Sequence, residues 1–417
     1  MGHRGILNSI RVAAALCLLL TGCLAPPSVV SVPPSDTPIN LSGILPPGSA
    51  PEANDPIRIL FIHGIGADAT NYCLPVPLML HLAKVLGAQP QTATPPWMPP
   101  KGSASVCSGV PVPEPIQIRV TGAPDPALLF HYRLDGDGGK RTVDFWFLLW
   151  APLTQTWKET PSVMEDGHPP WAVATELAKG FMQTHLTDVV LYGGTYRAVM
   201  RPSVEAALCY VVGGQPDPAD PNYRDCDGGT AAKRTVVITH SMGGYMLFDA
   251  VADLKAHHSP GMGTAAPASH PRDASAKLLS STDQVFMLAN QLALLDLTTA
   301  TAFPSAPGDD PAHVKPLRAF ADRWKEVHDA DPTRPRRGRQ IVAISDPNDL
   351  LSFVVTAGAI DVSGGTTVAN VYLGTAPDWF GLFASPASAH NNYLTDTDVM
   401  DIIACGMSGN RILRCTP

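Results

Sequence analysis

Residues 234–251 read RTVVITHSMGGYMLFDAV, and this stretch decides the fold. The apolar run from Val236 to Ile238 is typical of a buried strand in a parallel sheet. An amphipathic pattern, typical of a helix, follows Thr-His-Ser-Met-Gly at once. Ser241 therefore lies at a strand–helix junction, with Gly243 shortly after it. Two interpretations are compatible with this position: a tight turn capped by a serine, or a nucleophile held at the end of a sheet.

The segments on both sides of this stretch alternate between strand and helix patterns. We expect strands at 57–64, 115–122, 127–134, 142–150, 283–288, 339–345 and 367–374, and helices that include 76–87 and 317–330. Asp137-Gly138 predicts a hairpin between two of the strands. This alternation predicts an α/β fold with a mostly parallel central sheet flanked by helices. Residues 151–202 interrupt the alternation as an insertion with an amphipathic helical pattern, and residues 258–280 are predicted to form a surface loop.

A serine hydroxyl becomes a nucleophile only with a base within hydrogen-bond reach and donors for the oxyanion. The sequence THSMG resembles the G-x-S-x-G nucleophile elbow of the α/β-hydrolase superfamily, with Thr239 in place of the first glycine. FIHGIG, residues 61–66, resembles the His-Gly stretch of lipases and esterases in the same superfamily. The resemblance implies an α/β-hydrolase fold over about 57–405, with the insertion at 151–202 as a helical cap or lid. It implies Ser241 as nucleophile, and the N–H groups of Ile65 and Met242 as the oxyanion hole.

The superfamily order along the chain is serine, then acid, then histidine. His390 is the one histidine beyond the ISDPNDLLSF segment, so this order indicates His390 as the base rather than His63 or His240. Two acids remain open at the end of the strand 339–345, where catalytic groups collect in open α/β sheets. Asp349 better resembles the acidic turn of these hydrolases, and Asp346 is the alternative.

The function implied is that of a serine hydrolase that cleaves carboxylic esters through an acyl-enzyme. The expected partner is a small-molecule or lipid ester, and no cofactor or metal is expected. Two alternatives use the same fold: an acyltransferase with the same acyl-enzyme, and a non-catalytic binding lipoprotein. The formal net charge of −8 and the lack of a basic stripe argue against a nucleic-acid partner.

The N-terminus has the order of an export signal: Arg4 and Arg11 precede the apolar run VAAALCLLLTGC. LTGC, residues 20–23, resembles the bacterial lipobox, in which the cysteine becomes the lipid-modified N-terminus. We therefore expect a signal peptide at 1–22 and a lipid anchor at Cys23. We also expect a Pro-rich tether over 23–56 and a hydrolase domain over 57–417. This order predicts a bacterial cell-envelope protein held in the membrane by its anchor, most simply in the outer membrane.

Cysteine usage agrees with an exported protein. Outside the signal and the proposed anchor there is an even number of cysteines, as in proteins of oxidising compartments. Fifteen pairings of six cysteines exist in principle. Because short loops close most easily, proximity in sequence favours Cys73–Cys107, Cys209–Cys226 and Cys405–Cys415.

Overall fold

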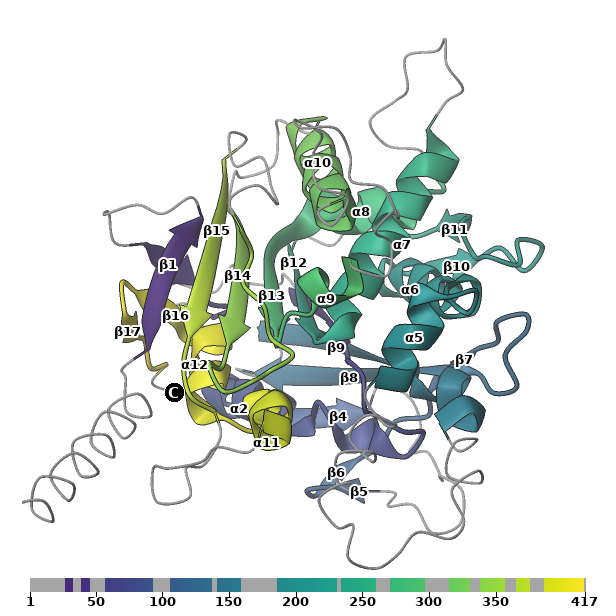
Figure 1. The fold of residues 1–417 in the computed structure, drawn as a ribbon. Helices are drawn as coiled ribbons and strands as arrows, with labels where there is room; N and C mark the ends of the chain where they lie inside the picture. Colours follow the sequence, from purple (N-terminus) through teal and green to yellow (C-terminus); the bar gives the residue numbers. More distant parts are fainter. Residues whose placement is uncertain are drawn as a thin grey trace, which may run out of the picture.

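The computed structural model describes residues 27–32, 39–45, 57–92, 106–136, 141–158, 186–230, 234–259, 271–296, 315–330, 338–356, 365–375 and 386–415. These residues form a mixed α/β structure around one large sheet (Figure 1). Within the described residues, no helix combines the length and the apolar character that crossing a bilayer requires.

Among the described residues, the central sheet has 10 strands. Their order is β1 (Ser28–Val32), β15 (Thr366–Tyr372), β14 (Arg339–Ser345), β13 (Thr282–Leu288), β12 (Arg234–His240), β3 (Ile57–Ile62), β9 (Arg141–Leu149), β8 (Ala127–Gly136) and β4 (Gln89–Thr92), with β7 (Ile116–Ile118) also paired to β8. The inner strands from β9 to β15 run parallel. Strands β1, β8, β4 and β7 pair antiparallel at the two edges, so the sheet is mixed rather than purely parallel.

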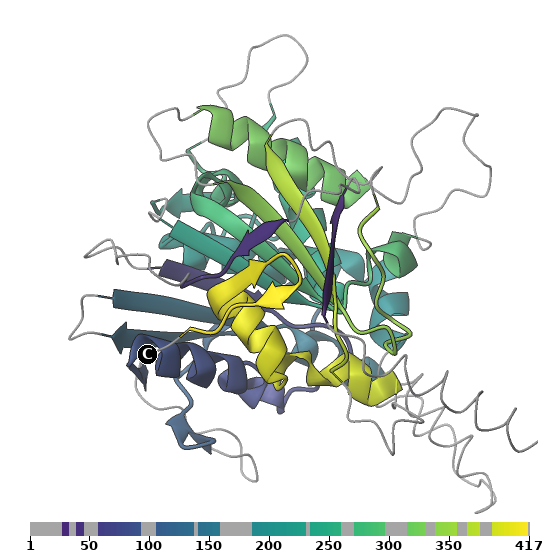
Figure 2. The same ribbon diagram turned by 90° about the vertical axis from the view of Figure 1, so that its left-hand side faces the viewer.

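Helices cover both faces of the sheet. Side chains alternate along β3, where Leu60 and Ile62 join one apolar cluster and Ile59 and Phe61 the other. The first cluster packs under α6 (Arg197–Val211), α7 (Met242–His258), α8 (Ala274–Ser281) and α10 (Lys315–Ala330). The second packs over α2 (Val76–Leu86) and α12 (Thr397–Cys405). Figure 2 shows α10 and the pair α2 and α12 on opposite sides of the sheet.

Shorter elements complete the described structure. They are η1 (Asn71–Cys73), η3 (Ala151–Thr154), α5 (Thr187–Gly193), α9 (Leu292–Asp296), α11 (Pro386–Asn391) and η9 (Asn392–Leu394). Three small sheets join β5 (Val106–Cys107) to β6 (Val110–Pro111), β10 (Gly214–Pro216) to β11 (Cys226–Gly228), and β17 (Arg411–Ile412) to β16 (Gly406–Ser408) and β2 (Asn40–Ser42).

The segment expected to be only a tether contains two strands. β1 pairs antiparallel with β15 and so forms the edge of the central sheet. β2 pairs with β16 near the C-terminus. The β-branched valines of SVVSV favour an extended strand, and antiparallel pairing with β15 stabilises it among the surrounding prolines. Residues 1–26, which include the proposed signal peptide and Cys23, lie outside the described residues.

Two further expectations need correction. Residues 274–281, expected within a surface loop, form helix α8, which begins at Asp273 because its carboxylate accepts the N–H of Ala276. The end of the expected cap insertion, from Arg197, belongs to α6, which packs beside α7 over the sheet. Residues 159–185, with the expected helix at Val173, Leu177 and Phe181, lie outside the described residues.

The structure contains disulfides at the three pairings that proximity in sequence favours. Cys73–Cys107 ties η1 to β5, Cys209–Cys226 ties α6 to β11, and Cys405–Cys415 ties α12 to the C-terminal segment. The three Cα–Cα distances are 5.4, 5.5 and 5.5 Å, within the usual range for disulfides.

Candidate active site

Ser241 occupies the turn between β12 and α7 in a conformation that non-glycine residues rarely adopt. Its φ is 55° and its ψ is −128°. Such backbone geometry costs on the order of 1–3 kcal/mol and persists only where the surroundings impose it. Ser241 is 2% exposed, and its N–H donates to the carbonyl of Leu288 at the end of β13. The neighbouring strand thus helps to hold the strained turn in place.

Small residues after Ser241 allow α7 to cross close to the sheet. A Cβ on Gly243 would lie 2.5 Å from the carbonyl oxygen of Ile62, so a side chain there would collide with the backbone of β3. A Cβ on Gly244 would lie 3.1 Å from Oγ1 of Thr239. Gly244 therefore leaves room for the threonine that replaces the first glycine of the elbow pattern.

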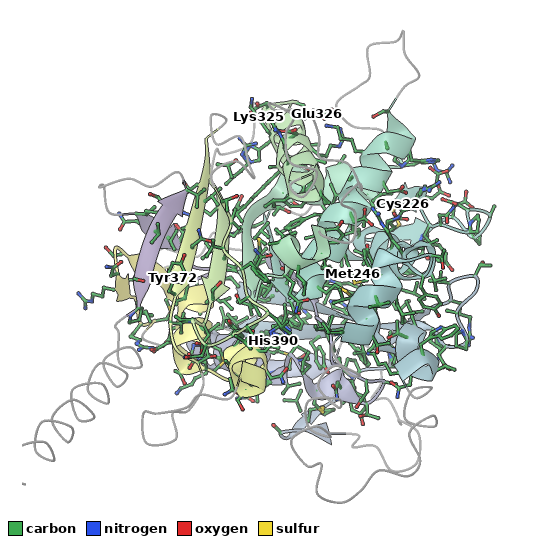
Figure 3. All side chains as sticks on the ribbon, viewed as in Figure 1. Cys226, Met246, Lys325, Glu326, Tyr372 and His390 are labelled. Atoms are coloured by element: carbon green, nitrogen blue, oxygen red, sulfur yellow. A yellow bond between two sulfur atoms is a disulfide. The ribbon has the colours of Figure 1, made fainter. Side chains whose placement is uncertain are left out.

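His390 lies next to Ser241 although the two are far apart in sequence. Its Nε2 is 3.1 Å from Oγ of Ser241. It belongs to α11, at the end of the sheet toward which the arrows of β14 and β15 point (Figures 1 and 3). Its main-chain carbonyl accepts a hydrogen bond from Nε2 of His240 at 2.9 Å. His240, which the sequence sets aside as a base, therefore holds the backbone of His390.

Asp349 is the acid that contacts this histidine. Both of its carboxylate oxygens lie near Nδ1 of His390, at 3.1 and 3.0 Å, and both side chains are fully buried. A carboxylate only accepts hydrogen bonds, so Nδ1 carries the proton and Nε2 is left to accept the hydroxyl of Ser241. This chain from Asp349 through His390 to Ser241 is the arrangement that activates a serine.

Asp346, the alternative acid, has a different set of partners. Its carboxylate accepts the N–H and the side-chain amide of Asn348 at 2.8 and 3.0 Å. It also accepts the N–H and hydroxyl of Thr375 at 2.5 and 2.9 Å. These contacts join the loop after β14 to the loop after β15. Asp346 thus shapes the turn on which Asp349 stands.

Tyr393 is a site residue that sequence reasoning does not identify. Its hydroxyl donates to Oδ2 of Asp349 at 3.1 Å and accepts the N–H of Asp346 at 2.7 Å. Burial, together with the charge of Asp349, raises the pKa of Tyr393 well above 10, so the hydroxyl keeps its proton. Only its position one turn after His390 in HNNY marks it in the sequence, and that spacing has no chemical signature of its own.

The segments that carry the two expected oxyanion donors both reach Ser241. Met242 is the first residue of α7, where N–H groups are unpaired and the helix dipole is positive. A Cβ on Gly64 would lie only 2.2 Å from Cβ of Ser241, so the loop after β3 touches the serine. Ile65, the next residue, is 3% exposed. The structure therefore brings the segments that carry both N–H groups to Ser241.

His63 has a structural part in this loop. Its Nδ1 donates to the carbonyl of Gly64 at 2.6 Å, and its Nε2 accepts the N–H groups of Trp150 and Ala151 at 3.1 and 3.3 Å. The indole N–H of Trp150 donates to the carbonyl of His63 in return, at 2.9 Å. Burial, assisted by the nearby charge of Lys158, holds the pKa of His63 well below 6.5, so the ring stays neutral.

The aromatic residues of the insertion at 151–202 could line an acyl pocket, and the described ones have mixed surroundings. Tyr192 is buried and donates to Asp249 at 2.8 Å, so it belongs to the packing between α5 and α7. The hydroxyl of Tyr196 donates to the carbonyl of Leu153, and the ring of Trp157 meets it edge-on. Trp157 is 48% exposed. Trp171 and Phe181 lie outside the described residues.

One group of possible metal ligands lies away from Ser241, among the described residues. Asp225, His257 and His258 each offer an atom within 4.8 Å of the others. The guanidinium of Arg272 already contacts Asp225 at 3.1 Å, and Nε2 of His258 donates to the carbonyl of Arg224 at 2.9 Å. These partners satisfy the acid and the ring nitrogen without an ion, so we assign no metal to the group.

No protein-family model matches this chain, and no curated protein matches it significantly.

Proposed function

We propose that the chain is a serine hydrolase of the α/β-hydrolase type that cleaves carboxylic esters through an acyl-enzyme. The observation that carries this proposal is the buried chain of contacts from Asp349 to His390 to Ser241, with the serine in a strained turn at the end of a central strand. Strain of this kind is common at active sites, because a packed scaffold imposes it for function. A serine that only capped α7 would need neither the strain nor the histidine.

The topology supports the finer assignment of fold. The serine follows β12, the acid follows β14 and the histidine follows β15, which is the chain order of α/β-hydrolases. The ends of these parallel strands meet at one edge of the sheet, where open α/β sheets place their ligands. In this chain, β4 to β8 come between β3 and its parallel neighbour β9 in sequence.

In the proposed mechanism, Oγ of Ser241 attacks the ester carbonyl carbon while Nε2 of His390 takes the hydroxyl proton. The negative charge then forms on the former carbonyl oxygen, facing the N–H groups of Ile65 and Met242. His390 passes its proton to the leaving alcohol as the C–O bond breaks and the acyl-enzyme forms. A water molecule, deprotonated by His390, then attacks the acyl carbon. The bond from that carbon to Oγ of Ser241 breaks, His390 returns the proton to Oγ, and the acid is released. Asp349 stabilises the charged imidazole in both steps.

The proposed localisation is the bacterial cell envelope, with a lipid on Cys23. If so, only residues 24–27 separate the anchor from β1. An extended chain spans at most about 3.6 Å per residue, so this linker reaches no more than about 18 Å. The body is then held close to the membrane rather than at the end of a long tether.

The test of function is turnover of p-nitrophenyl esters of graded acyl length. Ser241→Ala and His390→Ala are each expected to lower kcat by at least about 10³-fold, and the double variant by little more than either alone. Non-additivity is expected because the two residues act in one step. Ser203→Ala and His81→Ala are matched controls: Ser203 is a buried serine bonded within α6, and His81 pairs with Asp401 at 2.9 Å.

The same assay separates the alternatives. Faster acyl transfer to an added alcohol than to water would identify an acyltransferase. Absence of turnover in the folded wild-type protein across the ester series would favour a non-catalytic binding role. Equal turnover by Ser241→Ala and the wild type would exclude Ser241 as the nucleophile.

A further inference from the structure

The loop Gly64–Ala67 determines where the N–H of Ile65 points. Gly64 touches Ser241, and Gly66 has a φ of 79°, a conformation that suits glycine. A short loop with a glycine in this region has several backbone conformations open to it. Contacts from outside the loop are therefore needed to keep one peptide N–H directed at the oxyanion.

A buried ion pair, Lys158 with Asp188, forms hydrogen bonds to the backbone of this loop just after Ile65. Oδ2 of Asp188 accepts the N–H of Gly66 at 3.3 Å and lies 2.9 Å from Nζ of Lys158. The same Nζ donates to the carbonyl of Ala67 at 2.6 Å. The carboxylate of Asp188 thus binds the N–H of Gly66, and the ammonium of Lys158 binds the carbonyl of the next residue, Ala67.

The pair itself is held in place by its surroundings. The hydroxyl of Thr154 donates to Oδ1 of Asp188 at 2.9 Å, and the ammonium of Lys158 lies 5.6 Å from the centre of the Trp150 ring. The Lys158 side chain is 8% exposed and that of Asp188 is 0% exposed. Burial raises the pKa of the Asp188 carboxyl, and the charge of Lys158 opposes that rise.

His63 holds the other side of Ile65. Its ring binds the carbonyl of Gly64 and the N–H groups of Trp150 and Ala151, as described above. Ile65 therefore lies between two fixed points, His63 at Gly64 and the ion pair at Gly66 and Ala67. Residues of the segment that follows β9 contribute to both points: Trp150 and Ala151 bind His63, and Lys158 belongs to the ion pair.

Stability alone is a poor explanation for the pair. Replacing a buried ion pair with apolar residues of similar volume is often neutral or stabilising, because the charges lose their hydration on burial. The position of the pair suggests another use. Lys158 and Asp188 flank residues 159–185 in sequence, and their contact brings both flanks of that segment to the loop beside Ser241.

We propose that Lys158 and Asp188 are a positioning pair, which fixes the Gly64–Ala67 loop so that the N–H of Ile65 faces the oxyanion. The proposal deepens the proposed function and rests on Ser241 being the nucleophile. Neither side chain is assigned a contact with the substrate. Their effect passes through the backbone of the loop, and therefore acts on the transition state rather than on ground-state binding.

The test replaces both charges together, because either alone would leave a buried charge without its partner. Lys158→Met/Asp188→Leu is expected to stay folded and to lower kcat by about 10- to 100-fold with KM nearly unchanged, as for a weakened oxyanion donor. Binding of a boronic acid transition-state analogue should weaken by a similar factor. The single variant Lys158→Arg keeps the charge and the partner Asp188, so its kcat should lie between that of the double variant and that of the wild type.

The matched control is the ion pair between Arg323 and Asp273, which joins α10 to α8 at 2.6 Å with side chains 6% and 0% exposed. Arg323→Met/Asp273→Asn removes an ion pair that is buried to a similar extent. The side-chain oxygen of the new asparagine still accepts the N–H of Ala276 and so caps α8. The kcat of this control should match that of the wild type, even if its melting temperature falls further than that of the test variant.

Hydrogen exchange of the peptide that contains residues 64–67 gives a readout independent of activity. Exchange there should be faster in Lys158→Met/Asp188→Leu than in the wild type and the control. Unchanged exchange, or unchanged kcat in an active protein, would overturn the proposal. If the wild type neither hydrolyses esters nor reacts with a fluorophosphonate, the proposed function fails; the exchange result then still decides whether the pair holds the loop.

Discussion

At the scale of single residues, two aspartates on one turn have separate tasks. Asp349 contacts the imidazole of His390, whereas Asp346 binds Asn348 and Thr375. The sequence favours Asp349, which better resembles the acidic turn of hydrolases, and keeps Asp346 as an alternative because both acids follow the same strand. Their hydrogen-bond partners come from distant segments, and the spacing of the two acids carries no information about those partners.

We predict that Asp349→Asn is folded and nearly inactive. The amide keeps the shape but removes the charge and favours the wrong tautomer of His390, so kcat should fall by about 10⁴-fold. Asp346→Asn is the matched variant: it should keep kcat within about 10-fold and melt at a lower temperature. Turnover and melting temperature measured on both variants check this, and the reverse pattern would transfer the role to Asp346.

His63 predicts a dependence of stability on pH. Its folded-state pKa is depressed from 6.5, so the unfolded chain binds the proton more readily than the folded one. Its contribution is therefore complete above pH 6.5 and is lost as the pH falls below that value. The loss has a limiting slope of about 1.4 kcal/mol per pH unit.

Denaturant unfolding at a series of pH values between 7 and 5 checks this expectation. The free energy of unfolding should fall less steeply with decreasing pH in His63→Gln than in the wild type. The two slopes should differ by up to about 1.4 kcal/mol per pH unit, the value for one proton. Parallel curves for the two proteins would mean that His63 does not stay neutral in the folded state.

At the scale of elements, the crossing of α7 over β3 depends on one glycine. We predict that Gly243→Ala lowers the free energy of unfolding by more than about 3 kcal/mol, because its Cβ would meet the backbone of β3 at 2.5 Å. A Cβ in Gly244→Ala approaches side chains rather than backbone, with Oγ1 of Thr239 nearest at 3.1 Å, and should cost about 1 kcal/mol. Chemical denaturation of both variants checks the difference, and equal losses would contradict this account of the crossing.

Elements were predictable from sequence where one pattern dominated. The expected strands at 57–64, 234–240 and 339–345 each contain a run of apolar residues, and the structure places β3, β12 and β14 there. β1 was missed because it is a short edge strand among prolines and gains its stability from pairing with β15, which is distant in sequence. α8 was missed because its small residues look like a loop until they are buried against α10. Pairing and burial of this kind arise from the whole fold, and local sequence does not encode them.

The residues of the candidate site also fall into those that the sequence indicates and those that only the fold brings together. Motif and chain order indicate Ser241 and His390 as candidates because they constrain local backbone and topology, and the structure brings the two side chains within 3.1 Å. The sequence does not indicate Tyr393, Lys158 or Asp188, because each contacts backbone or carboxyl groups that are distant in sequence. The sequence places His240 beside Ser241, but its hydrogen bond to the carbonyl of His390 depends on how two distant segments meet.

At the scale of the whole molecule, the proposed anchor leads to a prediction about location. Cys23→Ala should abolish lipid modification and shift the protein from the membrane fraction to the soluble fraction. The proteolytic susceptibility of the folded body should not change, because β1 begins beyond the anchor. Fractionation and the mass of the N-terminal peptide check this. An N-terminal peptide that carries no lipid in the wild type would contradict the lipobox interpretation.

The central claim is that Ser241 is an activated nucleophile, and covalent labelling tests it most directly. The purified protein is treated with a fluorophosphonate, and the modified residue is located by mass spectrometry of its peptides. We predict one modified residue, Ser241, with labelling that is absent in Ser241→Ala and strongly slowed in Asp349→Asn. An unmodified Ser241 in the folded wild-type protein, or labelling that persists in Ser241→Ala, would contradict the claim.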